Sequence, residues 1–163
     1  NKQIAKNQII EMPSLMNQLF DDAQAYNVDY GHTLNLDIDS HCDLIGSDIE
    51  LASAFSNLIS NAIKYTPKGG TVTIGWHDDG EHGYFTVEDT GIGIDPKHLP
   101  RLTERFYRVD SARSRQTGGT GLGLAIVKHV LMQHNAYLEI DSEENKGSTF
   151  RVVFPKERLY MHE

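Results

Sequence analysis

Four short motifs, in a fixed order, constrain this chain more than any other feature of its sequence. They occupy residues 57–65, 89–94, 105–108 and 118–124. In that order they supply amide side chains suited to a metal ion, a carboxylate suited to a base, arginines suited to phosphates, and a glycine-rich segment that opens a helix. A triphosphate nucleotide requires all four kinds of group.

The composition is that of one globular domain with a single core. The chain has 163 residues, of which 39% are hydrophobic and 23% charged. Its net charge of −8 argues against nucleic acid as a partner, because phosphate backbones are bound through basic surfaces. The single cysteine, Cys42, cannot form an internal disulfide. No apolar stretch is long enough to span a membrane, so we expect a cytoplasmic piece of a longer protein without membrane contact of its own.

Periodicity predicts an α+β fold of two layers, a sandwich in which three helices cover one face of a mixed sheet of about five strands. We expect helices over 14–27, 47–64 and 122–134, and strands over 33–38, 72–76, 84–89, 137–142 and 149–154. Ser47 and Glu50 form a capping box at the second helix. Residues 95–121 lack periodicity and are predicted to be a long lid. We expect 1–12 to be a linker or the end of a preceding helix, 13–156 the domain, and 157–163 a tail.

The first motif places three polar residues on one face of the second helix. Asn57 and Asn61 are one turn apart, and Lys64 follows at the next turn. Amide oxygens are neutral ligands suited to Mg²⁺, Lys64 could reach a phosphate, and Tyr65 could lie against a base. A solvated helix face with incidental asparagines is the alternative. It is disfavoured because asparagine is a poor residue for a helix interior.

The second motif begins where a strand ends. Asp89 has the same parity as Phe85 and Val87, so its carboxylate should face the core and needs a donor such as the amino group of adenine. Gly91 and Gly93 let a ring approach the backbone closely. An ordinary Asp-Thr-Gly turn is the alternative.

The last two motifs supply groups for phosphates. Backbone N–H groups of residues 118–123, at a helix start, form an anion site, although the spacing is neither that of a Walker loop nor that of a dinucleotide fingerprint. Arg105, Arg108, Arg113 and Arg115 could stabilise a transferring phosphoryl group. A flexible hinge and solvated arginines are the alternatives. His129 and His134 are expected to be surface or boundary residues.

Together the motifs resemble the N, G1, F and G2 boxes of the ATP-binding catalytic domain of sensor histidine kinases, within the wider GHKL family. The likeness covers about residues 13–155, and the stretch 101–121 further resembles phosphate-regulon sensor kinases. The resemblance implies a Bergerat fold that binds ATP and Mg²⁺. It implies that Asp89 holds the adenine amino group, that Tyr65 packs on the ring, and that the metal ligands are Asn57, Asn61 and Gln116. The residues implied to act on the phosphates are Lys64, Arg105, Arg108 and Arg113. Together with Asn57, these four are the implied catalytic residues. The remaining implied nucleotide contacts are Gly91, Gly93, Ile94, Gly119, Thr120, Gly121, Leu122, Gly123, Leu124 and Thr149.

The resemblance also implies an activity and partners. A protein-histidine kinase transfers the γ-phosphoryl group of ATP to a histidine on a separate dimerisation domain. The phosphoryl group then passes to a response regulator, PhoB-like if the phosphate-regulon likeness holds. None of the histidines here begins the His-acidic-x-Arg/Lys-Thr/Ser-Pro run of a phosphoacceptor. We therefore expect the catalytic domain alone, from a protein anchored in the bacterial inner membrane.

Two other classes remain open. A GHKL ATPase of the gyrase, Hsp90 or mismatch-repair kind would share the pocket but hydrolyse ATP. Those enzymes carry a water-activating glutamate where Asn57 stands, and an amide cannot act as that base. The other class is a nucleotide-responsive binding module, either a pseudokinase or an anti-sigma-type serine kinase. The intact motifs count against a pseudokinase, and the lid sequence counts against the serine kinase.

Overall fold

Five strands form the main sheet in the part of the chain that the computed structural model describes, which is residues 7–90, 122–143 and 147–162. Their order across the sheet is β2-β4-β5-β7-β6. Strand β2 runs parallel to β4, and every other neighbouring pair is antiparallel. The strands are β2 (Thr33–Ile38), β4 (Thr71–Asp78), β5 (His82–Asp89), β6 (Tyr137–Glu143) and β7 (Gly147–Pro155).

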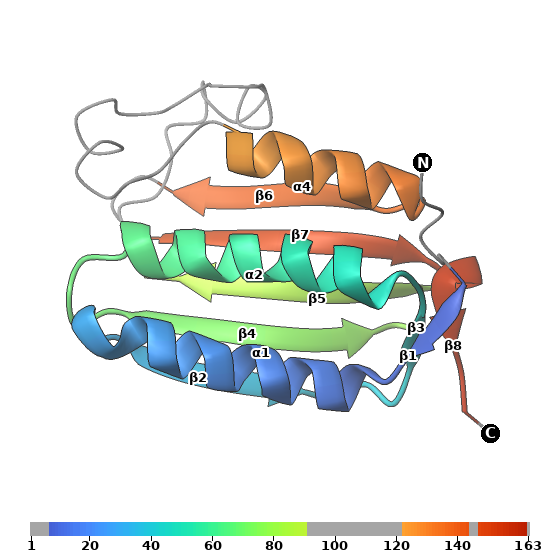
Figure 1. Cartoon of the computed structure of the whole chain (residues 1–163), viewed down its shortest axis with the longest axis horizontal. Helices are drawn as coiled ribbons and strands as arrows, with labels where there is room; N and C mark the ends of the chain where they lie inside the picture. The colour runs from blue at the N-terminus through green and yellow to red at the C-terminus, as the bar shows by residue number, and fades with distance from the viewer. Residues whose placement is uncertain (1–6, 91–121, 144–146, 163) are drawn as a thin grey trace.

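In the described part of the chain, three helices lie across one face of this sheet (Figure 1). They are α1 (Met12–Tyr26), α2 (Asp48–Tyr65) and α4 (Leu122–Gln133). Helix α1 contacts β2 and β4, α2 contacts β4 and β5, and α4 contacts both α2 and β6. This arrangement confirms the predicted α+β fold with a mixed sheet and helices on one face. Within the described residues, no helix is long and apolar enough to span a membrane.

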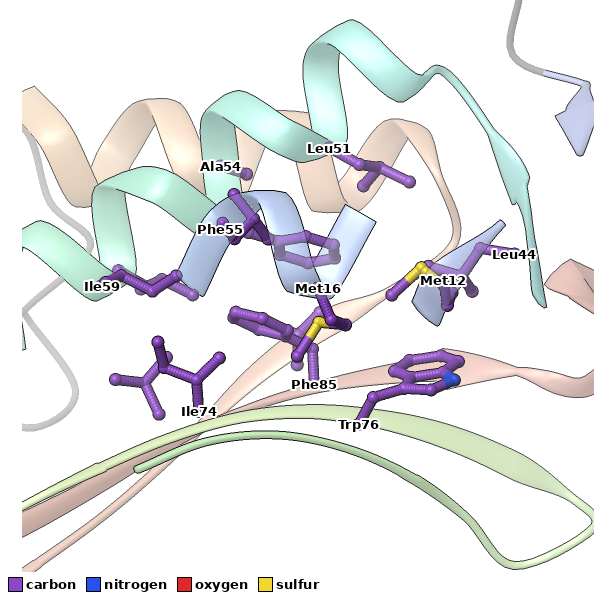
Figure 2. Close-up of a cluster of buried hydrophobic side chains, with 14 of the residues drawn as sticks. Met12, Met16, Leu44, Leu51, Ala54, Phe55, Ile59, Ile74, Trp76 and Phe85 are labelled. Carbon is purple, nitrogen blue, oxygen red and sulfur yellow. The ribbon is translucent and has the colours of Figure 1, made fainter. Parts of the chain in front are cut away.

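The core fills the space between the helices and the sheet. Figure 2 shows Phe55 of α2 lying against Phe85 of β5, and the two rings are stacked with centroids 4.0 Å apart. Phe154 meets both Phe55 and Trp76 edge-on at 6.2 Å. The indole Nε1 of Trp76 donates a hydrogen bond of 2.9 Å to the backbone oxygen of Cys42. Aromatic burial of this kind dominates the energetics of a small core and fixes α2 on the sheet.

A second, smaller sheet joins the two ends of the chain. It has the order β1-β3-β8 and consists of β1 (Gln8–Ile10), β3 (Asp43–Gly46) and β8 (Leu159–Tyr160). We expected a linker or preceding helix over 1–12 and a tail over 157–163. Residues 8–10 and 159–160 instead pair with β3. Strands this short contain too few alternating positions to be recognised from the sequence.

Buried Asp43 explains how these ends are held. Its Oδ1 accepts a hydrogen bond of 2.9 Å from the backbone N–H of Met12, the first residue of α1. Its Oδ2 lies 2.7 Å from Nε2 of His162. The residue before α1, Glu11, makes no side-chain cap. The cap of α1 therefore comes from a strand distant in sequence, and the same carboxylate secures the C-terminal segment.

Candidate functional site

The predicted site residues fall into two groups. The structure describes Asn57, Asn61, Lys64 and Tyr65 on α2, Asp89 on β5 and Thr149 on β7, and it begins α4 at Leu122, with Gly123 and Leu124 in its first turn. The lid predicted over 95–121 lies outside the described residues. So do these predicted site residues: Gly91, Gly93, Ile94, Arg105, Arg108, Arg113, Gln116, Gly119, Thr120 and Gly121.

The described motifs meet at one end of the sandwich. Figure 1 shows that the end of α2, the start of α4, the end of β5 and the start of β7 all lie there. Helices α2 and α4 are in direct contact. The helix predicted after the glycine-rich motif is present, and it begins at Leu122 as expected. Asn57 and Leu122 are 65 residues apart in the sequence, yet they belong to helices that are in contact.

Helix α2 carries the amide residues along one face. Its N-cap is Ser47, whose Oγ accepts a hydrogen bond of 3.2 Å from the backbone N–H of Glu50, which is one of the two bonds of the predicted capping box. The N–H of Ser47, which the box would pair with the Glu50 side chain, instead donates to Nε2 of His134 at 3.0 Å. Asn57, Asn61 and Lys64 are all partly exposed, at spacings that place them on one face of the helix. Asn57 donates from Nδ2 to the backbone oxygen of Ser53 at 3.2 Å. That bond uses the amide nitrogen, so it does not occupy the amide oxygen, which is the atom that binds a cation.

Asp89 lies on the face of the sheet that the helices cover. Phe85 and Val87, four and two residues earlier on β5, are fully buried on that face. Asp89 itself is partly exposed, and it stands between Val72 of β4 and Ser148 of β7. The predicted orientation of Asp89 toward the core side therefore agrees with the strand register.

Thr149, which the resemblance implies as a nucleotide contact, does not share the face of the sheet on which Asp89 lies. It pairs with Glu88 and Asp141, so strand alternation places it on the face away from the helices. Its neighbour Ser148 is opposite Asp89, is 7% exposed, and lies 2.9 Å from Ser142 through their hydroxyl oxygens. A shift of one residue along a strand moves a side chain to the other face. The buried positions Val152 and Phe154 share the parity of Ser148, and this pattern could have identified it from the sequence.

The backbone at the start of β7 lies very close to Asp89. Gly147 has a φ of 125°, and a Cβ atom there would overlap the backbone oxygen of Asp89. Only glycine permits this approach without strain. The next residue after Asp89, Thr90, is fixed by two bonds to Thr71: its N–H donates to the Thr71 oxygen at 3.1 Å, and its Oγ1 accepts from the Thr71 N–H at 3.0 Å. The position of Asp89 is therefore set from both sides.

Buried His134 was not predicted. His129 is exposed as expected, but His134 is 0% exposed and the expectation of a surface or boundary residue was wrong for it. Its Nε2 accepts a hydrogen bond of 3.0 Å from the N–H of Ser47, and its Nδ1 donates to the oxygen of Val130 at 2.9 Å. Because Nε2 accepts, the ring is neutral, with its proton on Nδ1. His134 thus ties the end of α4 to the start of α2.

The family of the chain follows from comparison with known proteins. The family model described as histidine kinase-, DNA gyrase B- and HSP90-like ATPase matches residues 46–158. The chain belongs to this family. ATP is accordingly the nucleotide for which this fold provides a site.

Sequence relatives within the family are sensor histidine kinases. The chain is 55% identical over 148 residues to the phosphate regulon sensor protein PhoR of Pseudomonas aeruginosa, covering 91% of this chain and 33% of that protein. It is 46% identical over 146 residues to PhoR of Haemophilus influenzae, covering 90% and 34%. The chain therefore spans about a third of the length of these curated relatives. The resemblance to sensor histidine kinases, and to the phosphate-regulon group among them, is confirmed.

Solved structures agree on the fold. The mycobacterial sensor histidine kinase MprB superposes with a TM-score of 0.78 at 27% sequence identity, covering 91% of this chain and 97% of that chain. A likeness that spans nearly the whole of both chains means that the arrangement of sheet and helices is that of a histidine kinase domain.

Proposed function

We propose that this chain is the ATP-binding catalytic domain of a two-component sensor histidine kinase. It transfers the γ-phosphoryl group of ATP to a histidine on a separate dimerisation domain of the same kinase, and a response regulator then receives the phosphoryl group. The observation that carries this proposal is the 55% identity to a sensor kinase across 91% of the chain. The position of the end of α2 and the end of β5 at the same end of the sandwich supports it (Figure 1).

The adenine site is proposed around Asp89. Its carboxylate accepts a hydrogen bond from the adenine amino group, and the ring of Tyr65 packs on the base. Ser148 replaces Thr149 in the proposal as the hydroxyl that reaches the adenine through water, because Ser148 shares the face of Asp89 and Thr149 does not. Gly91, Gly93 and Ile94 are proposed as further nucleotide contacts.

The phosphates and Mg²⁺ are assigned to the other motifs. Asn57, Asn61 and Gln116 supply amide oxygens to the metal, and the donor set fits, since these are neutral hard ligands. When bound, Mg²⁺ neutralises the charge on the phosphate oxygens. Lys64, Arg105, Arg108 and Arg113 contact the phosphates. Backbone groups of residues 119–124 bind them at the start of α4.

The partners and setting follow from the relatives. We propose that the phosphoacceptor domain belongs to the same kinase, that the response regulator is PhoB-like, and that the whole protein is anchored in a bacterial inner membrane. Nucleic acid is not a partner of this acidic chain, which has a net charge of −8.

An ATPase remains the second candidate, because the family includes gyrase- and HSP90-like members. Asn57 argues against it. An amide oxygen is not basic enough to take a proton from water, whereas the hydrolytic members use a glutamate at that position. A nucleotide-responsive binding module would bind ATP without transferring phosphate.

One labelling experiment separates these three functions. The chain is mixed with the separately made dimerisation domain of its own kinase and γ-labelled ATP. We expect weak labelling of that domain, because the two parts are no longer tethered. The label should be stable in base and lost in acid, as a phosphoramidate is. Asn61→Ala should abolish labelling by removing a Mg²⁺ ligand.

The matched control is Asn35→Ala. Asn35 is an exposed asparagine on β2, where its side chain reaches Thr73 at 3.5 Å, and its loss should leave labelling unchanged. Steady ATP turnover without the dimerisation domain, and no label on it when supplied, would establish the ATPase. Nucleotide binding with neither turnover nor labelling would establish the binding module.

A further inference from the structure

The last turn of α2 contains a carbonyl group that the helix itself cannot satisfy. In a helix, the oxygen of residue 63 would accept from the N–H of residue 67. Residue 67 is Pro67, which has no N–H. The preceding carbonyl, that of Ala62, is bonded twice, by the N–H of Thr66 at 3.1 Å and by its Oγ1 at 2.7 Å. Ile63 therefore needs a donor from outside the helix.

His32 provides that donor. Its Nε2 lies 2.8 Å from the backbone oxygen of Ile63, and the side chain belongs to a residue that is only 6% exposed. A carbonyl oxygen can only accept, so Nε2 carries the proton. The other ring nitrogen, Nδ1, is buried without a hydrogen-bond partner within the described residues. The ring is thus committed to a single bond, which caps the C-terminal end of α2.

The backbone of His32 is itself held in place by Asn27. Asn27 accepts from the His32 N–H through Oδ1 at 3.1 Å and donates from Nδ2 to the His32 oxygen at 2.7 Å. Gly31, with a φ of 72°, makes the turn between them. The next residue, Thr33, begins β2 and donates to the oxygen of Gly70 at 2.8 Å. The donor of the cap is therefore fixed to the sheet.

We infer that His32 is a positioning residue for the nucleotide site, acting through the last turn of α2. That turn carries Lys64 and Tyr65, and it directly follows Asn61. The inference rests on the proposed function, which gives those three residues to ATP and Mg²⁺. Without the cap, the Ile63 carbonyl must turn toward water, and the last turn frays for part of the time. The apparent association constant is then the intrinsic one multiplied by the fraction of molecules whose last turn remains in place.

Two amide substitutions test the position of the donor. In His32→Gln, the side-chain Nε2 is as many bonds from the backbone as the histidine Nε2, so the cap is retained. In His32→Asn, the amide is one methylene shorter and cannot reach Ile63. Calorimetric titration of the whole 163-residue chain with Mg²⁺ and a nonhydrolysable ATP analogue measures the affinity. We expect His32→Asn to bind about five- to tenfold more weakly than the native chain, and His32→Gln to bind within about twofold of it.

His134 is the matched control, because it is a buried histidine whose ring is hydrogen-bonded to the opposite end of α2, at Ser47. His134→Asn removes its bond to Ser47, which should lower stability to urea without changing nucleotide affinity, since no site residue lies in that turn. All titrations are made at low temperature on variants whose circular dichroism is native. Asn27→Ala, which removes both bonds to the His32 backbone, is a second variant expected to weaken binding in the same direction.

The titrations distinguish failure of the inference from failure of the proposed function. Native affinity in His32→Asn and in Asn27→Ala, or an equal loss of affinity in His32→Asn and His134→Asn, would make His32 a purely structural residue and overturn the inference alone. Failure of the native chain to bind the analogue would instead overturn the proposed function, and the inference with it.

Discussion

Asp89 and Ser148 are the pair of residues on which base recognition depends in the proposed site. They stand opposite each other on β5 and β7, on the face that the helices cover, and the glycine before Ser148 lets the two strands approach closely. The neighbouring pair, Glu88 and Thr149, stands opposite each other on the other face. A shift of one residue along these two strands therefore exchanges a pair that faces the proposed nucleotide site for a pair that faces away from it.

Asp89→Asn should weaken nucleotide binding by about tenfold or more, because the adenine amino group loses a charged acceptor and meets an amide in its place. Calorimetric titration with ADP measures this. Glu88→Gln is the control, since it makes the same chemical change at an exposed position on the opposite face, and its affinity should remain native. Equal affinities in the two variants would remove Asp89 from the site.

At the scale of elements, the β4–β5 hairpin is closed by a carboxylate and a phenol at the end remote from Asp89. The Tyr84 hydroxyl donates to Oδ2 of Asp79 at 2.7 Å, and Oδ1 of Asp79 accepts from the N–H groups of Glu81 and His82 at 2.9 and 2.7 Å. The bond from Tyr84, followed by those backbone bonds, lowers the pKa of Asp79 to about 2. The bond to Asp79, followed by burial, raises the pKa of Tyr84 to about 12.

The hairpin should therefore show a defined pH dependence. The pKa of Tyr84 is above its ordinary value of 10.0, so its stabilisation is complete below pH 10 and is lost as the pH rises toward 12. The pKa of Asp79 is below its ordinary value of 3.8, so its stabilisation is present above that pH and is lost toward pH 2. Asp79→Asn should return the pKa of Tyr84 toward 10, as measured by NMR titration of ring-labelled tyrosine. Glu81→Gln, on the same turn, should leave that pKa high, and a low value in both variants would contradict the assignment to Asp79.

At the scale of the whole molecule, the small sheet β1-β3-β8 joins both ends of the chain to the body that carries the site. Asp43 is central to it, since its two carboxylate oxygens bind the N-terminus of α1 and His162. Asp43 is only 4% exposed. If its carboxylate were removed, water could not take its place as the acceptor for the N–H of Met12.

Asp43→Ala should lower the free energy of unfolding by about 2–3 kcal/mol, through loss of a helix cap and of a buried hydrogen bond. Urea unfolding followed by circular dichroism measures this. Asp37→Ala, on the exposed edge strand β2, is the control and should change stability by less than about 0.5 kcal/mol. Similar losses in the two variants would show that Asp43 is not a buried cap.

The sequence by itself determined the helices and strands whose buried residues recur at a short, regular spacing. Helical spacing over 47–64 and alternation over 33–38 and 84–89 predicted α2, β2 and β5, because burial on one face imposes a period that neighbouring residues display. The ordered motifs indicated the family for the same reason, since each is a local run of residues. Thr149, implied by the resemblance as a nucleotide contact, is one residue from Ser148, and period-two alternation places the two side chains on opposite faces of the sheet.

The tertiary structure alone decided which distant groups satisfy one another. Met12 and Asp43, Ser47 and His134, and Ile63 and His32 are hydrogen-bonded pairs separated by 31, 87 and 31 residues. Each pair satisfies a helix end whose need is visible locally, as with the carbonyl four residues before Pro67. The donor or acceptor that meets the need comes from another element, and no local period marks it. Helix ends are therefore predictable from this sequence, whereas their partners depend on how the sheet and helices pack.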